Sequence, residues 1–88
     1  MGCLWLQFCV DLKDGVVQNN QPIQIWQCTS WVNPNQIWSL QSIGGGAYRI
    51  ASALSQNKCI DIRGNSPYQG DSIVLYDCYY AEAWVVST

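Results

Sequence analysis

The first half of this 88-residue chain carries three kinds of side chain that together suit the recognition of a sugar. A sugar ring offers neighbouring hydroxyls that both donate and accept hydrogen bonds, and it also offers an apolar C–H face. A site for it therefore needs a carboxylate, an amide and a flat aromatic ring held close together. Asp11, Asn35 and Trp26 supply these groups, and Gln24 and Gln36 supply further amides. They form one site only if the fold brings them together.

The sequence contains two copies of one repeat, which we place at about 1–43 and 47–88 of a single domain spanning 1–88. Cys9-Val10-Asp11-Leu12 recurs fifty positions later as Cys59-Ile60-Asp61-Ile62, and Ile23 to Cys28 recurs at the same offset as Ile73 to Cys78. A third marker, Gln36-Ile37-Trp38, recurs as Glu82-Ala83-Trp84, so the second copy is four residues shorter after Cys78. Three consecutive glycines, Gly44 to Gly46, lie at the boundary between the two copies.

Each marker alternates in polarity with a period of two, which predicts half-buried strands, and no stretch has helical periodicity. The side predicted to face the core carries Val10, Leu12, Ile23 and Ile25. The opposite side carries Asp11, Gln24 and Trp26 in the first copy and Asp61, Val74 and Tyr76 in the second. We also expect a strand at Tyr48 to Ala51 that opens the second copy, with Leu4 to Leu6 as its counterpart in the first.

These markers resemble the repeat of the ricin B-chain type lectins, in which a Cys-hydrophobic-Asp segment precedes a hydrophobic-Gln-hydrophobic-Trp-x-Cys strand and a Gln-x-Trp motif. The first copy matches every element and ends in Asn35-Gln36-Ile37-Trp38, while the second copy matches more loosely. The resemblance implies a β-trefoil, in which three such repeats surround a pseudo-threefold axis. Since two repeats are present, we expect an all-β, incomplete trefoil, or one completed by oligomerisation through its exposed strand edges.

The resemblance also assigns roles to the first copy. Asp11 would accept hydrogen bonds from two adjacent ring hydroxyls, Asn35 would donate to one of them, and Trp26 would stack on the apolar face. Gln36 would steady the carboxylate from behind, and Gln24 is a further polar contact by position. The loop at 13–22 would form the rim. The resemblance implies a non-catalytic, carbohydrate-binding module whose partners are glycans, with galactose-type sugars expected first because their axial hydroxyl leaves one ring face mostly apolar.

Structural interpretations of the same residues stay open. Asp11 stands near the Asp14-Gly15 turn and could be an Asx-turn residue, and Trp26 could belong to the core. Trp38 is expected in the interior with its N–H satisfied. Asp61 and Tyr76 offer a second site, but the amide donor is lost there and a structural relic is the alternative. The positions of Gln24, Asn35 and Gln36 are taken in the second copy by Val74, Ala81 and Glu82.

The cysteines follow the repeat, except for Cys3. In related lectins the matching positions often form disulfides, which here would be Cys9–Cys28 and Cys59–Cys78. Each would add roughly 3 kcal/mol in an oxidising compartment. The N-terminus lacks the basic and cleavage regions of a signal peptide, so reduced thiols remain an equal alternative and the localisation, cytoplasmic or secreted from a longer precursor, stays open.

Composition excludes several classes of function. A net charge of −2 with four Lys and Arg residues gives no basic patch for nucleic acid, and no apolar run is long enough to span a membrane. Without histidine or a Cys-x-x-Cys pair we expect no metal and no cofactor, and Ser-His-Asp and Cys-His catalysis are ruled out. Carboxylates that could serve a glycosidase are expected to be solvated; they are Asp71, Asp77 and Glu82.

Two other functions remain as alternatives. The first is a β-trefoil that binds a protein, such as a protease inhibitor, whose contacts would come from the loops at 13–22 or 63–72. The second is the sugar-targeting fragment of a larger glycosidase or toxin. In the first alternative Asp11 would be incidental to binding.

Overall fold

The computed structural model describes residues 7–63, 70 and 72–85, so Cys3, Asp71 and the strand expected at Leu4 to Leu6 lie outside the described residues. The strands are β1 Phe8–Leu12, β2 Ile23–Gln27, β3 Trp38–Gly44, β4 Ala47–Ser52, β5 Ser55–Ile62, β6 Ile73–Asp77 and β7 Trp84–Val85. Short 3-10 turns follow β1, precede β3 and follow β6; they are η1 Lys13–Gly15, η2 Pro34–Gln36 and η4 Cys78–Tyr80. The described ranges contain no α-helix, and the all-β prediction is confirmed. Among these residues no helix has the length and apolar character to cross a membrane.

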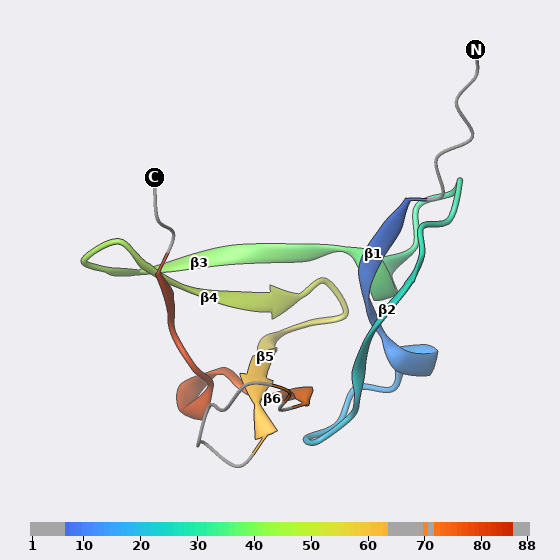
Figure 1. The fold of residues 1–88 in the computed structure, drawn as a ribbon. Helices are drawn as coiled ribbons and strands as arrows, with labels where there is room; N and C mark the ends of the chain where they lie inside the picture. Colours follow the sequence, from blue (N-terminus) through green and yellow to red (C-terminus); the bar gives the residue numbers. More distant parts are fainter. Residues whose placement is uncertain (1–6, 64–69, 71, 86–88) are drawn as a thin grey trace.

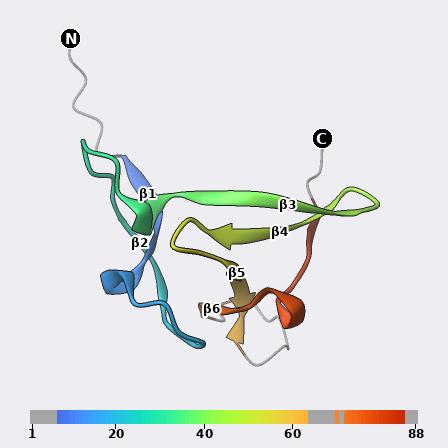
Figure 2. The same ribbon diagram turned by 180° about the vertical axis from the view of Figure 1, so that it is seen from behind.

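The strands form two antiparallel sheets. β1 and β2 make a two-stranded hairpin in which Asp11 lies directly opposite Gln24 and Cys9 opposite Trp26. The second sheet has the order β3-β4-β5-β6, with β7 added to β4. Figures 1 and 2 show the long β3–β4 hairpin extending from the β1–β2 hairpin, with β5 and β6 turned away below it.

The three glycines between the two copies form the tight turn of the β3–β4 hairpin. Gly44, Gly45 and Gly46 have φ values of 94°, 63° and 78°, which side chains with a Cβ seldom adopt. β3 ends the first copy and β4 begins the second, so strands of both copies pair in one sheet. The strand expected at Tyr48 to Ala51 is confirmed within β4.

The core is built from the matching strands of the two copies, although not from equivalent positions, since Leu12 and Ile23 match Ile62 and Ile73. Its buried residues come one each from β1, β2, β5 and β6 and are Leu12, Ile23, Ile60 and Leu75. Trp38 and Trp84 pack against this cluster. The Trp38 indole Nε1–H donates to the Val10 carbonyl at 2.9 Å, which satisfies it as expected. A second buried cluster contains Ala51, Cys59 and Ala81.

Two burial predictions from the alternation are wrong. Ile25, expected in the core, is 64% exposed. Val74, expected on the outer face, is only 3% exposed, because the β1–β2 loop lies on β6. There Pro22 pairs with Val74, and Leu75 exchanges backbone hydrogen bonds with Asn20 and Gln21. Alternation predicts which side of a strand a residue faces, but it does not predict which segment covers that side.

Candidate functional site

Four of the five residues assigned to a sugar site in the first copy line one surface hollow of about 440 Å³. The hollow lies where the ends of β1 and β2 meet η1 and η2, and its lining residues are Asp11, Lys13, Asp14, Gln24, Trp26, Thr29, Asn33 and Asn35. This volume falls within the range of roughly 300–1,000 Å³ found for small-molecule sites. The fifth residue, Gln36, supports Asp11 from behind.

Asp11 is held by one amide on each carboxylate oxygen. Gln24, its cross-strand neighbour, donates from Nε2 to Oδ1 at 3.1 Å, and Gln36 donates from Nε2 to Oδ2 at 2.9 Å. Both donors are distant in sequence, so these contacts are tertiary and differ from the local backbone contact of an Asx turn. Asp11 is 5% exposed, and its rotamer is therefore fixed by burial and by both donors. A carboxylate has about four acceptor positions, so each oxygen retains capacity for one further donor.

Gln36 joins this carboxylate to the end of β2. Its Nε2 also donates to the Gln27 carbonyl at 3.0 Å, and its Oε1 accepts the Thr29 backbone N–H at 3.2 Å. Both ends of the amide are thus engaged by protein groups. Gln36 acts as a positioning residue for Asp11.

Asn35 reaches the hollow from η2, and its placement depends on a glycine in the opposite loop. Asn33 caps η2 by accepting the Asn35 backbone N–H on its side chain at 3.1 Å, and Pro34 occupies the first position of the turn. The Asn35 amide lies against Gly15, where an added Cβ would fall 2.7 Å from its Oδ1. Gly15 also has a φ of 66°. The backbone conformation favours glycine here, and a Cβ would force the Asn35 amide to move.

Trp26 is 58% exposed, which rules out the core interpretation of this residue. It projects from the strand face that also carries Asp11 and Gln24. Lys13 and Asp14, at the start of the loop at 13–22, also line the hollow. Thr29 and Asn33 are lining residues that the sequence pattern did not indicate; their only signal was their place in the loop between Cys28 and Asn35.

The matching residues of the second copy are arranged differently. Asp61 is 5% exposed, and its Oδ1 accepts the backbone N–H of Glu82 at 3.0 Å, where the first copy uses a side-chain amide. Val74 and Ala81 are buried, and Tyr76 is half-buried. The Glu82 contact is made by its backbone, so it does not reproduce the support that Gln36 gives to Asp11.

Both disulfides expected from the resemblance are present. Cys9–Cys28 and Cys59–Cys78 join the first strand of each marker pair to the end of the second, with Cα–Cα distances of 5.3 and 4.8 Å. Cys9 lies opposite Trp26, and Cys28 begins the loop that carries Thr29 and Asn33. The first disulfide therefore fixes one wall of the hollow.

Comparison with known families agrees with this geometry. Residues 7–76 match the ricin-type β-trefoil lectin domain-like family. The chain belongs to this family. Among its relatives, agglutinin-1 of Abrus precatorius is 33% identical over 75 residues, and β-galactoside-specific lectin 3 of Viscum album is 31% identical over 70 residues. The ribosome-inactivating protein PMRIPm of Polygonatum multiflorum is 34% identical over 84 residues.

These matches cover 85%, 80% and 91% of this ricin-type domain, respectively. They cover only 11% to 13% of the relatives, so the chain spans about an eighth of their length. No solved structure matches the chain. Family membership, together with the antiparallel all-β structure, confirms the predicted class of fold.

Proposed function

We propose that the hollow at Asp11 binds galactose-type sugars on glycans, and that this domain acts as a non-catalytic lectin module. The observation that carries the proposal is the meeting of Asp11, Gln24, Trp26 and Asn35 around one hollow. Two relatives in Viscum album are named β-galactoside-specific lectins, which supports the choice of sugar.

In this proposal the protein presents a pre-formed polar group beside an apolar platform. Asp11 enters no new conformation on binding, because Gln24 and Gln36 already hold both of its oxygens. Its free acceptor positions take the protons of two adjacent hydroxyls, and the Asn35 amide donates to one of these hydroxyls. The exposed Trp26 ring covers the apolar C–H face of the sugar.

A shallow site of this kind binds a monosaccharide with a dissociation constant near 1 mM, or about −4 kcal/mol. Useful avidity would come from several sites acting together, either on one longer chain or on associated copies. We propose two repeats, at about 1–43 and 47–88, and self-association through exposed strand edges. A stable monomer with a sharp thermal transition in light scattering and calorimetry would contradict the self-association.

Titration calorimetry with lactose tests the function through two exposed tryptophans. Trp26 is 58% exposed and lines the hollow, while Trp31 is 62% exposed and is not among its lining residues. Trp26→Ala should weaken lactose binding about fivefold or more, and Trp31→Ala should leave it within about twofold, since stacking on one ring contributes about 1 kcal/mol or more. Equal effects of the two substitutions would refute the proposed site.

Asp11→Ala is a second variant, but it needs a folding control. It removes the acceptor of the Gln24 amide and one of the two acceptors of the Gln36 amide, which costs about 1–3 kcal/mol of stability. Circular dichroism below the melting temperature separates loss of binding from loss of fold. Inhibition of a protease that survives both Trp26→Ala and Asp11→Ala would favour the protein-binding alternative.

A further inference from the structure

Two exposed tyrosines that directly follow Cys78 lie beside a separate hollow in the second copy. Tyr79 and Tyr80 on η4 are 81% and 65% exposed, and their ring centroids lie 5.0 Å apart at an interplanar angle of 81°. This edge-to-face arrangement is a favourable one for aromatic rings. The hollow has a volume of about 380 Å³ and is lined by Asn57, Asp77, Cys78, Tyr79 and Tyr80.

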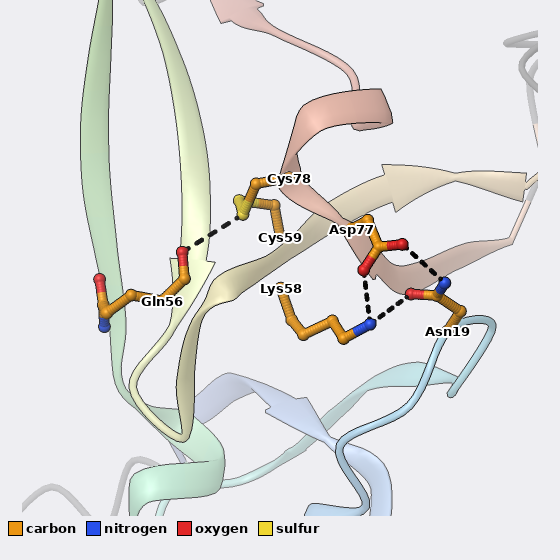
Figure 3. Close-up of polar contacts among 6 residues, drawn as sticks. All are labelled: Asn19, Gln56, Lys58, Cys59, Asp77 and Cys78. Carbon is orange, nitrogen blue, oxygen red and sulfur yellow. Dashed lines mark hydrogen bonds and ion pairs between the residues drawn. A yellow bond between two sulfur atoms is a disulfide. The ribbon is translucent and has the colours of Figure 1, made fainter.

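Asp77 is held in this hollow much as Asp11 is held in the first. Lys58 Nζ lies 2.6 Å from Oδ1, and Asn19 Nδ2 donates to Oδ2 at 3.1 Å (Figure 3). Lys58 also donates to Asn19 Oδ1 at 2.9 Å, which closes a ring of three side chains. Each carboxylate oxygen again accepts one donor and keeps capacity for another. The hydrogen bond from Lys58 and that from Asn19 lower the pKa of Asp77, so the carboxylate is ionised at neutral pH.

The walls of this hollow are attached to the second sheet. The Cys59–Cys78 disulfide joins the start of η4 to β5, on which Asn57 also lies. Cys78 Sγ lies 3.5 Å from the Gln56 carbonyl oxygen, a contact that Figure 3 also shows. The Tyr79 carbonyl accepts a hydrogen bond from Arg49 of β4 at 3.5 Å. The two tyrosines are therefore presented from a fixed turn.

We propose that this hollow is a second carbohydrate site, which takes one pyranose ring of a glycan. The tyrosine rings supply the apolar platform, and the Asp77 carboxylate and Asn57 amide supply the acceptor and donor for its hydroxyls. The site differs from the copy-two counterpart of the Asp11 hollow. Tyr76, which matches Trp26, precedes Asp77 on β6 and points to the opposite side of the strand.

The ion pair makes a sugar a better occupant than a charged peptide. Lys58 already balances the charge of Asp77, so the hollow offers polar atoms beside exposed rings without a net charge to attract an ionic ligand. The second site uses none of the residues of the Asp11 hollow. Its sugar preference is set by its own groups, so it can bind or fail to bind independently of the first.

Amide-resolved NMR of the Trp26→Ala chain tests this site with the first one impaired. Lactose, N-acetylglucosamine and methyl α-mannoside are titrated separately. With at least one probe, we expect progressive shifts at Asn57, Tyr79 and Tyr80 with a dissociation constant of about 1–10 mM. If no probe shifts these amides, or if the shifts centre on Asp61 and Tyr76 instead, the proposal is overturned.

Substitution of the tyrosines supplies a matched pair of variants. Tyr79→Ser/Tyr80→Ser should weaken the binding at least tenfold, whereas Tyr79→Phe/Tyr80→Phe keeps the rings and should retain most of it. Tyr79 and Tyr80 are exposed in the structure, so in both double variants the remaining resonances should be unchanged. Full binding by the serine variant would contradict the platform. In the wild-type chain, shifts at Tyr79 without shifts at Trp26 would refute the Asp11 site and leave this one standing.

Discussion

At the scale of single residues, the two copies differ in what holds their shared aspartate. Asp11 and Asp61 are equally buried at 5% exposure, but Asp11 is bound by two side-chain amides and Asp61 accepts a backbone N–H from Glu82. The replacement of Gln24 by Val74 and of Gln36 by Glu82 removes both side-chain donors. The difference lies in the residues around the aspartate and not in the aspartate itself.

Gly15 is the residue at which a small substitution should damage the Asp11 hollow most selectively. In Gly15→Ala the new Cβ would meet Asn35 Oδ1 at 2.7 Å, and the φ of 66° would be strained. We expect at least a fivefold loss of lactose binding and a stability cost of about 1–2 kcal/mol. Calorimetric titration and urea unfolding measure the two effects.

Gly45→Ala is the matched control for this prediction. Gly45 has a similar φ of 63°, but a Cβ there meets nothing within 4 Å. It lies in the turn between β3 and β4, away from the lining residues. The control should show a similar stability cost with unchanged binding, and a similar loss of binding in both variants would contradict the role given to Gly15.

At the scale of elements, the β1–β2 loop is attached to the second copy by its backbone and by side chains. Asn20 N–H donates to the Leu75 carbonyl at 2.8 Å, and Asn19 joins the Lys58–Asp77 ion pair. Figures 1 and 2 show this loop reaching from its hairpin toward β6. The same loop begins with Lys13 and Asp14, which line the Asp11 hollow.

This attachment should make stability depend on pH. The hydrogen bonds from Lys58 and Asn19 lower the folded-state pKa of Asp77 below its unfolded value of roughly 4. Its contribution is therefore present above that unfolded value and is lost as the pH falls through the folded pKa. Asp77→Asn should lower the melting temperature near neutral pH, and the difference from wild type should shrink on acidification.

Thermal unfolding across this pH range provides the check. Asp14→Asn changes an exposed carboxylate in the same loop and should leave the pH dependence of the melting temperature unchanged. If the difference in melting temperature between Asp77→Asn and wild type stayed constant or grew on acidification, the pKa of Asp77 would not be lowered by folding.

The sequence pattern predicted the strands and the side that each residue faces well. It predicted less well which residues are buried by segments distant in sequence. Period-two alternation placed Asp11, Gln24 and Trp26 on one strand face, because side-chain direction in a strand is a local property. It failed for Ile25 and Val74, because burial depends on segments distant in sequence. Likewise, the contact between Gly15 and Asn35 and the ring formed by Asn19, Lys58 and Asp77 required the tertiary structure.

At the scale of the whole molecule, the two disulfides have different surroundings. Cys59 is fully buried with Ala51 and Ala81, whereas Cys9 is half-buried in the β1–β2 hairpin. Each bond closes a loop of sequence separation 19 and should stabilise the chain by roughly 3 kcal/mol through the unfolded state. In the Cys59–Cys78 bond, loss of the buried Cys59 sulfur adds the cost of a cavity.

We therefore expect paired alanine variants to separate stability from binding. Cys59→Ala/Cys78→Ala should cost more free energy of unfolding, while Cys9→Ala/Cys28→Ala should weaken lactose binding more because its loop carries Thr29 and Asn33. Urea unfolding and calorimetric titration below the transition measure these quantities. The reverse order in either measurement would show that the disulfides do not have these separate roles.

The central claim is that one hollow, built from Asp11, Gln24, Trp26 and Asn35, holds a galactoside. NMR of the indole N–H groups during a lactose titration tests it most directly, with assignments taken from single Trp→Phe variants. We predict a saturable shift of the Trp26 indole resonance with a dissociation constant of about 1 mM, while the Trp31 resonance stays in place. A Trp26 resonance that does not move, or one that moves only together with Trp31, would contradict the account.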